Sequence, residues 1–166
     1  MEEHEKYMKH CLQLAEQALK NGDSPVGAIV VLDGTILGEG VESGKSSGDV
    51  TNHAEIIAIR NAINNGFRKD LLKAKLYTTH EPCIMCSYII RHHHIPQVIY
   101  GIPVKYIGGY TSSFNILVTE EVPFWGTKPT VTEGICKEAC EELNKRFLTR
   151  RNQTAKLFNN RKSRYQ

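Results

Sequence analysis

Two short motifs constrain this chain more than any other feature. The first is His53-Ala54-Glu55, and the second is Pro82-Cys83-Ile84-Met85-Cys86. A catalytic zinc site holds the metal with three nitrogen, sulfur or carboxylate ligands and leaves a fourth position for water. His53, Cys83 and Cys86 supply one imidazole and two thiols. The motifs therefore predict one zinc ion per chain, and the fold must bring the two segments together.

Glu55 follows the first of these ligands by two residues. A bound zinc lowers the pKa of its water from ~15.7 towards about 7, and a nearby carboxylate can carry protons between that water and a substrate. The order H-x-E…P-C-x-x-C is typical of zinc-dependent deaminases of nucleobases. The residues therefore favour hydrolytic deamination, with Glu55 as the proton carrier.

The spacing of the motifs also predicts their local structure. Cys83 and Cys86 are three residues apart, which places both on one face of a helix entered at Pro82. Asn52 or Thr51 can cap a second helix, whose first turn carries the first motif. Helix N-termini favour thiolates and direct backbone N–H groups towards anionic groups. We therefore expect both helices to begin at the metal.

Each motif alone has a simpler interpretation. Asn52 and Glu55 have the spacing of a capping box, and Cys-x-x-Cys also occurs in redox pairs and structural zinc sites. A structural zinc would need a fourth protein ligand, such as His80 or a histidine of the run 92–94. Three consecutive side chains cannot share one helical face, so this run favours a solvated helix end or pocket rim. The two motifs in this order favour the catalytic site.

Length and charge suggest one domain with a basic tail. The chain has 166 residues, for which we expect a single deaminase domain over residues 1–151 and a basic tail over residues 152–166. The formal net charge is +3, yet residues 143–166 carry eight Lys or Arg and no acid. No apolar run is long enough to span a membrane, and no signal-peptide pattern is present. Five cysteines, two of them assigned to zinc, suit a reducing cytoplasm.

Hydrophobic periodicity and turn residues predict an α-β-β-α-β-α-β-β-α order. We expect a three-layer α/β/α fold with a mixed sheet of about five strands, because a hairpin supplies antiparallel strands and helical crossovers supply parallel ones. The predicted helices span residues 3–21, 53–65, 83–92 and 133–151, and the predicted strands span residues 27–32, 35–37, 75–79, 97–101 and 130–132.

With these motifs in place, the chain resembles the cytidine and deoxycytidylate deaminase superfamily. Within it, the tRNA-specific adenosine deaminase and guanine/cytosine deaminase branch is most similar. Beyond the zinc motif, this similarity rests on Pro25-Val26-Gly27-Ala28, His53-Ala54-Glu55-Ile56 and Thr132-Glu133-Gly134-Ile135. The resemblance implies a cytidine-deaminase-like fold, a homodimer, zinc on His53, Cys83 and Cys86, and Glu55 as proton shuttle.

Two departures from this branch concern the substrate. Its members usually carry Asn in the loop before the first zinc helix, where the amide contacts the base, and the aligned residue here is Glu42. The tRNA enzymes usually carry an Arg-Asp pair where this chain has Pro103-Val104. A carboxylate only accepts hydrogen bonds, so Glu42 at the pocket would prefer a base edge rich in N–H donors. The simpler interpretation places Glu42 in solvent, paired with Lys45.

Three functions follow from these observations. The leading hypothesis is an enzyme acting on a free base or nucleoside, with Glu42, Ala54 and Pro82 as substrate-binding residues. The second is a tRNA adenosine deaminase, because the basic segment 145–164 could hold a phosphate backbone. The third is a non-catalytic, zinc-stabilised RNA-binding module, which would not require Glu55. The Phe124-Trp125 pair favours a core or interface anchor over a base-stacking platform.

Overall fold

A five-stranded mixed sheet forms the centre of the molecule. The computed structural model describes the backbone of residues 1–162 and the side chains of residues 1–155. The strand order is β2-β1-β3-β4-β5. β1 pairs antiparallel with β2 and with β3, whereas β3 with β4 and β4 with β5 are parallel. The strands are β1 (Gly27–Leu32), β2 (Thr35–Val41), β3 (Lys75–His80), β4 (Gln97–Ile102) and β5 (Thr130–Thr132).

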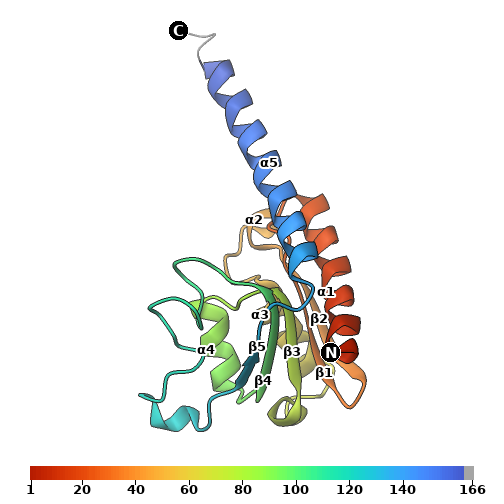
Figure 1. Cartoon of the computed structure of the whole chain (residues 1–166), viewed down its shortest axis with the longest axis vertical. Coiled ribbons are helices and arrows are strands. Elements are labelled where there is room, and N and C mark those ends of the chain that lie inside the picture. Colours follow the sequence, from red (N-terminus) through yellow and green to blue (C-terminus); the bar gives the residue numbers. More distant parts are fainter. Residues whose placement is uncertain (163–166) are drawn as a thin grey trace.

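Helices cover both faces of this sheet (Figure 1). α1 (Glu2–Asn21) and α5 (Lys137–Lys162) lie on one face, and α3 (Ala54–Asn64) and α4 (Ile84–His92) lie on the other. Successive side chains of a strand point to opposite faces. In β1, Ile29 and Val31 accordingly pack in the cluster with α1, while Ala28 and Val30 pack in the cluster with α3. The three-layer α/β/α prediction is confirmed.

The strand β2 lies unusually close to α3. It follows β1 through the two-residue turn Asp33-Gly34, where both residues have positive φ (46° and 84°), as the sequence predicts for this hairpin. A Cβ added at Gly38 would lie 2.3 Å from the Ala58 carbonyl oxygen, and one at Gly40 would lie 1.9 Å from that of Ala54. These glycines therefore allow the strand to continue to Val41, beyond the predicted end at residue 37.

The final helix differs from its predicted bounds at both ends. It begins at Lys137 rather than residue 133, because Gly134 and Cys136 adopt left-handed backbone conformations with φ of 80° and 53°. Cys136 thus precedes the helix, whereas Cys140 lies on it and is buried. The helix continues to Lys162, past residue 151, and projects from the body (Figure 1). Residues 163–166 of the predicted tail lie outside the described residues.

The segment between β4 and β5 is irregular apart from η2 (Pro123–Trp125). The buried Arg91 guanidinium organises it by donating to the carbonyls of Leu117 (3.0 Å) and Thr119 (2.8 Å) and by lying over the Trp125 ring. Trp125 is buried, but Phe124 is 74% exposed, so only one member of the predicted anchor pair is in the core. Within residues 1–162, no helix has the length and apolarity that a membrane crossing requires.

Candidate active site

The three predicted metal ligands meet at the N-termini of α3 and α4. His53 and Cys83 occupy the positions directly before these helices, and Cys86 lies in the first turn of α4. The Sγ atoms of Cys83 and Cys86 are 3.6 Å apart, and each lies 3.4 Å from His53 Nδ1. Tetrahedral zinc, with Zn–S bonds of about 2.3 Å and Zn–N bonds of about 2.0 Å, requires spacings of about 3.8 and 3.5 Å. The cluster fits zinc.

Glu55 lies beside this cluster and is almost completely buried (3% exposed). Its Oε1 accepts a hydrogen bond from the Thr78 hydroxyl of β3 (3.2 Å), and its Oε2 lies 3.4 Å from Cys86 Sγ. Burial raises the pKa of Glu55 to about 7. A carboxyl group with such a pKa can both take up and release a proton near neutral pH.

The two thiols of the cluster are electrostatically different. The hydrogen bond between the two thiols, together with the hydrogen bond to His53, lowers the pKa of Cys83 to about 4. The same hydrogen bond, followed by burial, raises the pKa of Cys86. Cys83 is therefore ready to bind a metal as the thiolate. A divalent cation favours the thiolate form of both cysteines, so metal binding would release the remaining proton.

Glu42 caps α3, a role for which the sequence favoured other residues. Its Oε2 accepts the backbone N–H of Ala54 (3.2 Å), and its Oε1 accepts that of Gly44 (3.0 Å), the first residue of the one-turn helix α2 (Gly44–Ser47). The predicted caps are wrong: the Asn52 amide donates to Ser47, and the Thr51 hydroxyl donates to Asp49. Glu42 replaces them because the end of β2 brings its carboxylate directly to the N-terminus of α3.

A cavity of about 490 Å³ opens over the cluster. Its walls come from four regions that are distant in sequence: the β1 entry, the β2–α3 connection, the β3–α4 connection with the segment after β4, and α5. Glu42 lines this cavity and is only 8% exposed, so the alternative of a solvent-exposed pair with Lys45 is wrong. The lining residues are Ser24, Val26, Glu42, His53, Glu55, His80, Glu81, Cys83, Pro103, Val104, Lys105, Ile107 and Asn144.

Two other predicted substrate-binding residues lie behind this lining. The Ala54 N–H is already bound to Glu42, and the Pro82 carbonyl accepts the Gly109 N–H (2.9 Å) and the Ser87 hydroxyl (3.2 Å). Both residues are buried. Their contact with substrate therefore stays a prediction.

Glu81 was not singled out from the sequence, although it directly precedes the second motif. Its buried carboxylate accepts hydrogen bonds from the backbone N–H groups of Val104 (2.8 Å), Tyr110 (2.8 Å) and Thr111 (2.7 Å), and from the Thr111 hydroxyl (2.7 Å). A Cβ at Gly108 would lie 2.3 Å from Glu81. Glu81 thus fixes the segment after β4 that forms one wall of the cavity. The only feature of the sequence that could have indicated this role is the position of an acidic residue directly before the second motif.

His80 and Asn144 also line the cavity without having been predicted to do so. His80 appeared in the sequence as a possible fourth zinc ligand, but it is not part of the metal-binding cluster in the described residues. His92 to His94 are not part of it either. His92 stacks on Tyr88, and His94 Nδ1 lies 3.1 Å from the Trp125 carbonyl oxygen, in agreement with the predicted helix end.

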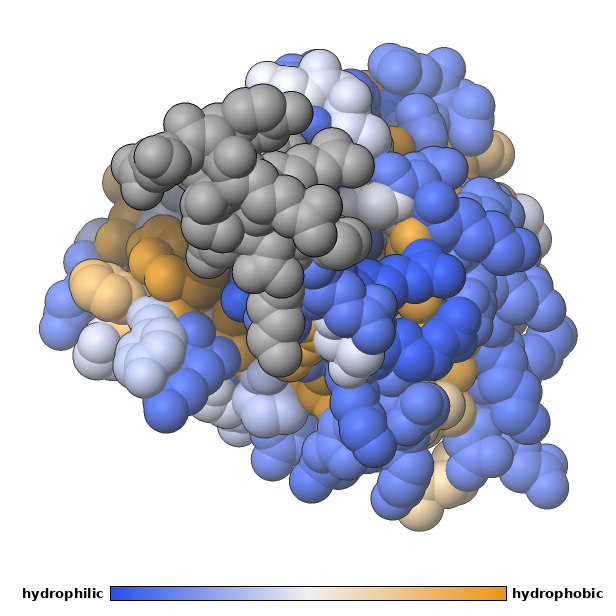
Figure 2. Space-filling view, turned by 90° about the horizontal axis from the view of Figure 1, so that it is seen from above, coloured by the Kyte–Doolittle hydropathy of each residue, from blue (hydrophilic) through white to orange (hydrophobic). Residues whose placement is uncertain are grey.

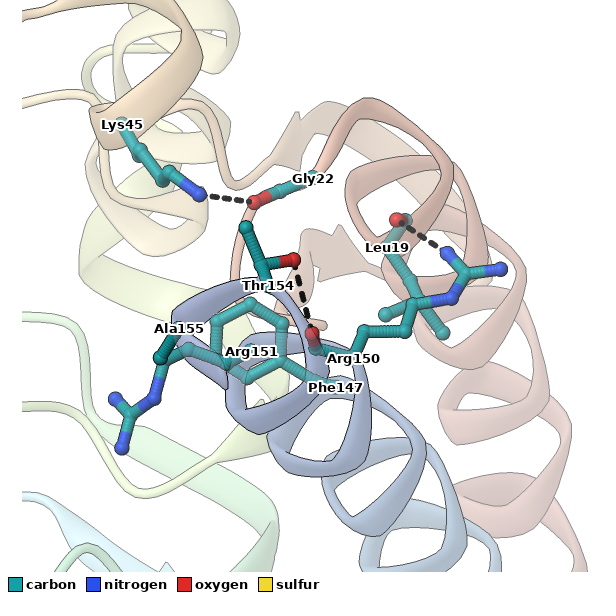
Figure 3. Close-up of a pocket in the computed structure, with 8 residues that line it drawn as sticks. All are labelled: Leu19, Gly22, Lys45, Phe147, Arg150, Arg151, Thr154 and Ala155. Atoms are coloured by element: carbon teal, nitrogen blue, oxygen red, sulfur yellow. Dashed lines mark hydrogen bonds between the residues drawn. The ribbon is translucent and has the colours of Figure 1, made fainter. Parts of the chain in front are cut away.

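A second cavity, of about 570 Å³, lies between the C-terminus of α1, α2 and α5 (Figure 3). Leu19, Phe147 and Ala155 give it apolar walls, and Lys45, Arg150 and Arg151 surround it with cations. The Lys45 ammonium donates to the Gly22 carbonyl (3.3 Å), and Arg150 donates to that of Leu19 (3.2 Å), so both neutralise the C-terminal end of α1. We call this the basic groove.

Viewed from the end at which α5 projects, the surface is divided (Figure 2). Hydrophilic residues dominate the right of this view, whereas hydrophobic residues show at the left, where Figure 1 places α4 and the segment after β4. Six of the ten exposed large hydrophobic residues in the described part lie on these elements, namely Tyr88, Tyr106, Ile107, Tyr110, Phe114 and Phe124.

Several known proteins are similar to this chain in sequence and in architecture. Residues 1–102 match the family model described as the cytidine and deoxycytidylate deaminase zinc-binding region. A tRNA-specific adenosine deaminase of Haemophilus influenzae is 35% identical over 154 residues, which cover 92% of this chain and 87% of the relative. A solved structure from work on A-to-I editing by tRNA:A34 deaminases at the wobble position of transfer RNA is 30% identical, with a TM-score of 0.75, and covers 83% of this chain and 98% of that one. A guanine deaminase of Bacillus subtilis is 37% identical, with a TM-score of 0.57, and covers 60% and 64%.

The role of Glu81 can be tested by replacing it with Gln. Glu81→Gln keeps the shape of the side chain but turns an N–H donor towards the backbone donors that the carboxylate now binds. We expect a loss of about 1–3 kcal/mol of stability, because buried donors lose their partners. Hydrogen exchange should become faster at residues 104–111. The exposed Glu120→Gln is the matched control, and unchanged exchange in Glu81→Gln would contradict the role.

Proposed function

The chain belongs to the cytidine and deoxycytidylate deaminase family, and we propose that it is a zinc-dependent enzyme that converts adenosine to inosine in tRNA. The observation that carries the chemistry is the zinc-compatible cluster with a buried, proton-accepting Glu55 beside it. The substrate is supported by relatives that cover most of this chain and act, by name, on tRNA. The comparisons favour this function over the free base or nucleoside that led the sequence analysis.

In this mechanism the chain itself positions one carboxylate and one metal. Zinc, when bound by His53, Cys83 and Cys86, supplies a Lewis acid that lowers the pKa of a bound water. Thr78 holds Oε1 of Glu55, and Oε2 accepts from the Cys86 thiol (3.4 Å). Because zinc binding removes that thiol proton, Oε2 then becomes the oxygen that can carry a proton. We propose that Glu55 takes one proton from the attacking water and passes it to the ring nitrogen beside the reacting carbon. Once the water oxygen is bonded to that carbon, Glu55 passes the second proton of the water to the amino group, which leaves as ammonia.

The basic groove supports an RNA substrate. It adjoins the catalytic cavity along two connections: Ser24 and Glu42 line the cavity, while Gly22 and Lys45, two and three residues from them, line the groove. Cations that flank a catalytic cavity can hold the phosphate backbone of a nucleic acid whose base enters that cavity. Arg151 is exposed at this position. We propose that the groove binds phosphates next to the target nucleotide.

A free amino-base remains the second candidate, and Glu42 favours it. Its carboxylate lines the cavity and accepts hydrogen bonds only, so it suits a base edge with N–H donors. Each oxygen of the Glu42 carboxylate already accepts one backbone N–H. The protein itself therefore supplies the hydrogen-bond donors that the sequence analysis expected from the substrate. The observation thus supports the free-base hypothesis less than the sequence suggested.

Two variants separate metal binding from chemistry. Cys83→Ala removes a ligand and should lose zinc and stability, because metal binding is coupled to folding. Glu55→Gln cannot carry a proton; it should keep zinc and the fold but lose at least ~10²-fold in turnover. Metal content, thermal unfolding and inosine formation measure these effects. Near-normal turnover of Glu55→Gln would show that Glu55 is not the proton carrier, whereas zinc-loaded wild type without any turnover would favour the non-catalytic, zinc-stabilised RNA-binding module.

A substrate screen distinguishes the two candidate enzymes. We expect inosine formation in tRNA, and no comparable ammonia release from guanine, cytosine or adenosine. Arg151→Glu should raise KM for tRNA about tenfold and reduce the salt dependence of binding by about one phosphate contact. Lys137→Glu makes the same charge change on α5, outside the groove, and is the matched control. Turnover of a free base without turnover of tRNA would establish the second candidate instead.

We also propose an isologous homodimer. The exposed hydrophobic residues on α4 and the segment after β4 form an apolar surface beside the catalytic cavity, and burying such a surface favours association. Light scattering at micromolar concentration should give twice the chain mass. Phe124→Asp, on the 74% exposed side chain of η2, should weaken the dimer, whereas Leu72→Asp on η1 (Asp70–Lys73), which is not one of the residues of this surface, should not. A monomeric wild type would refute the dimer.

A further inference from the structure

Thr78 is a fully buried threonine that lies outside both motifs and contacts the proposed proton carrier. It belongs to β3, where it pairs with Ala28 of β1 on one side and with Tyr100 of β4 on the other. Its hydroxyl donates to Oε1 of Glu55 (3.2 Å), a residue 23 positions earlier in the sequence. The central strand of the sheet thus holds one oxygen of the carboxylate that carries protons in the proposed function.

The layer that surrounds this hydroxyl is apolar. Successive residues of a strand alternate between the two faces of the sheet, so Thr78 shares its face with Leu76. Leu76 packs with Val30 and Val98 in the hydrophobic cluster that also contains α3. Burying a hydroxyl in such a layer is unfavourable unless the hydroxyl is hydrogen-bonded. A valine has a similar shape without this cost, so packing alone does not account for a threonine at this position.

The hydrogen bond from Thr78 restricts the rotation of the Glu55 carboxylate. The last torsion of a glutamate side chain has broad, roughly two-fold minima, so an unrestrained carboxylate exchanges its two oxygens easily. Thr78 holds Oε1 on the side of the sheet, and Oε2 lies 3.4 Å from Sγ of Cys86, on the side of the predicted metal ligands. The two oxygens therefore have different surroundings, and the contact with Thr78 determines which of them faces the site.

The same hydrogen bond is compatible with both states of Glu55 that proton transfer requires. In the ionised carboxylate, Oε1 accepts from the Thr78 hydroxyl. When the proton is on Oε2, Oε1 is a carbonyl oxygen and still accepts. The contact with the sheet therefore does not have to break when Glu55 takes up a proton or when it releases one.

We propose that Thr78 is a positioning residue for the deamination, which keeps Oε2 of Glu55 directed at the attacking water and the substrate during both proton transfers. The proposal deepens the proposed function and rests on it. Thr78 is fully buried behind the described lining of the cavity, so it acts through Glu55 and does not touch the substrate. Without its hydroxyl, the carboxylate turns freely, and only part of the bound complexes have an oxygen in the productive position.

The hydrogen bond can be tested without substrate, by infrared spectroscopy of the zinc-loaded protein. In each background, subtraction of the spectrum of the corresponding Glu55→Gln variant gives the carboxyl band of Glu55. Thr78→Val should shift this band, because Oε1 loses its donor, whereas Thr78→Ser keeps a hydroxyl and should leave it in place. Thr35→Val, at the exposed start of β2, is the matched control. A band that does not respond to Thr78→Val would overturn the proposal.

Single-turnover kinetics test the consequence for the reaction. At saturating enzyme, Thr78→Val should slow inosine formation in tRNA about tenfold, as for the loss of one hydrogen bond to a charged group, with unchanged zinc content and tRNA affinity. Thr78→Ser should restore most of the rate. In the Glu55→Gln background, Thr78→Val should have no further effect, because Thr78 acts through the carboxylate. An unchanged rate, a rate that Thr78→Ser does not restore, or effects that multiply would refute the proposal.

The two experiments also separate this inference from the proposed function. If tRNA is not a substrate, the infrared band still reports the hydrogen bond, and the same variants are then measured on the base found in the screen. If tRNA is turned over but neither the band nor the rate responds to Thr78→Val, the proposed function stands and the role of Thr78 is wrong.

Discussion

The site depends on the close approach of two helix N-termini, which places His53 Nδ1, Cys83 Sγ and Cys86 Sγ within 3.4 to 3.6 Å of one another. His53 starts α3 and Cys83 starts α4, and they come from opposite ends of the motif region. The parallel pairing of β3 with β4 places α4, and the packing of Gly38 and Gly40 in β2 against α3 places the other helix. Glu42 then closes the N-terminus of α3. All three contacts join segments that are distant in sequence, although the motifs that they position are short and continuous.

Such a division explains what the sequence could predict. Element type and order follow from periodicity and turn residues, and the ligands follow from the chemistry of zinc. The cap of α3 could not be predicted, because a local rule selected Asn52 or Thr51, whereas Glu42 arrives through the β2–α3 packing. The start of α5 was misplaced for a similar reason. Gly134 and Cys136 have positive φ values in the connection that leads from β5 to α5. The pattern of apolar residues does not indicate these backbone conformations.

The cavity walls were the least predictable part of the site. Glu81 binds residues 23 to 30 positions away, and Asn144 reaches the cavity from the last helix. Polar residues such as these look like solvated surface in a sequence. Only the fold shows that Glu81 is 1% exposed and that its four hydrogen bonds replace water. The predicted metal ligands and Glu55 thus come from two motifs, whereas the cavity walls come from segments that meet only in three dimensions.

The distribution of polar groups bears on the choice between a free base and RNA. A cavity of about 490 Å³ is large enough for a single nucleobase, and a free base would need no other site. The basic groove has no role in that reaction. It carries two arginines and Lys45, which lies three residues after Glu42 of the cavity, so a base in the cavity and a phosphate in the groove would contact neighbouring residues. A polyanion attached to the base uses both sites, and this arrangement, together with the relatives, favours tRNA.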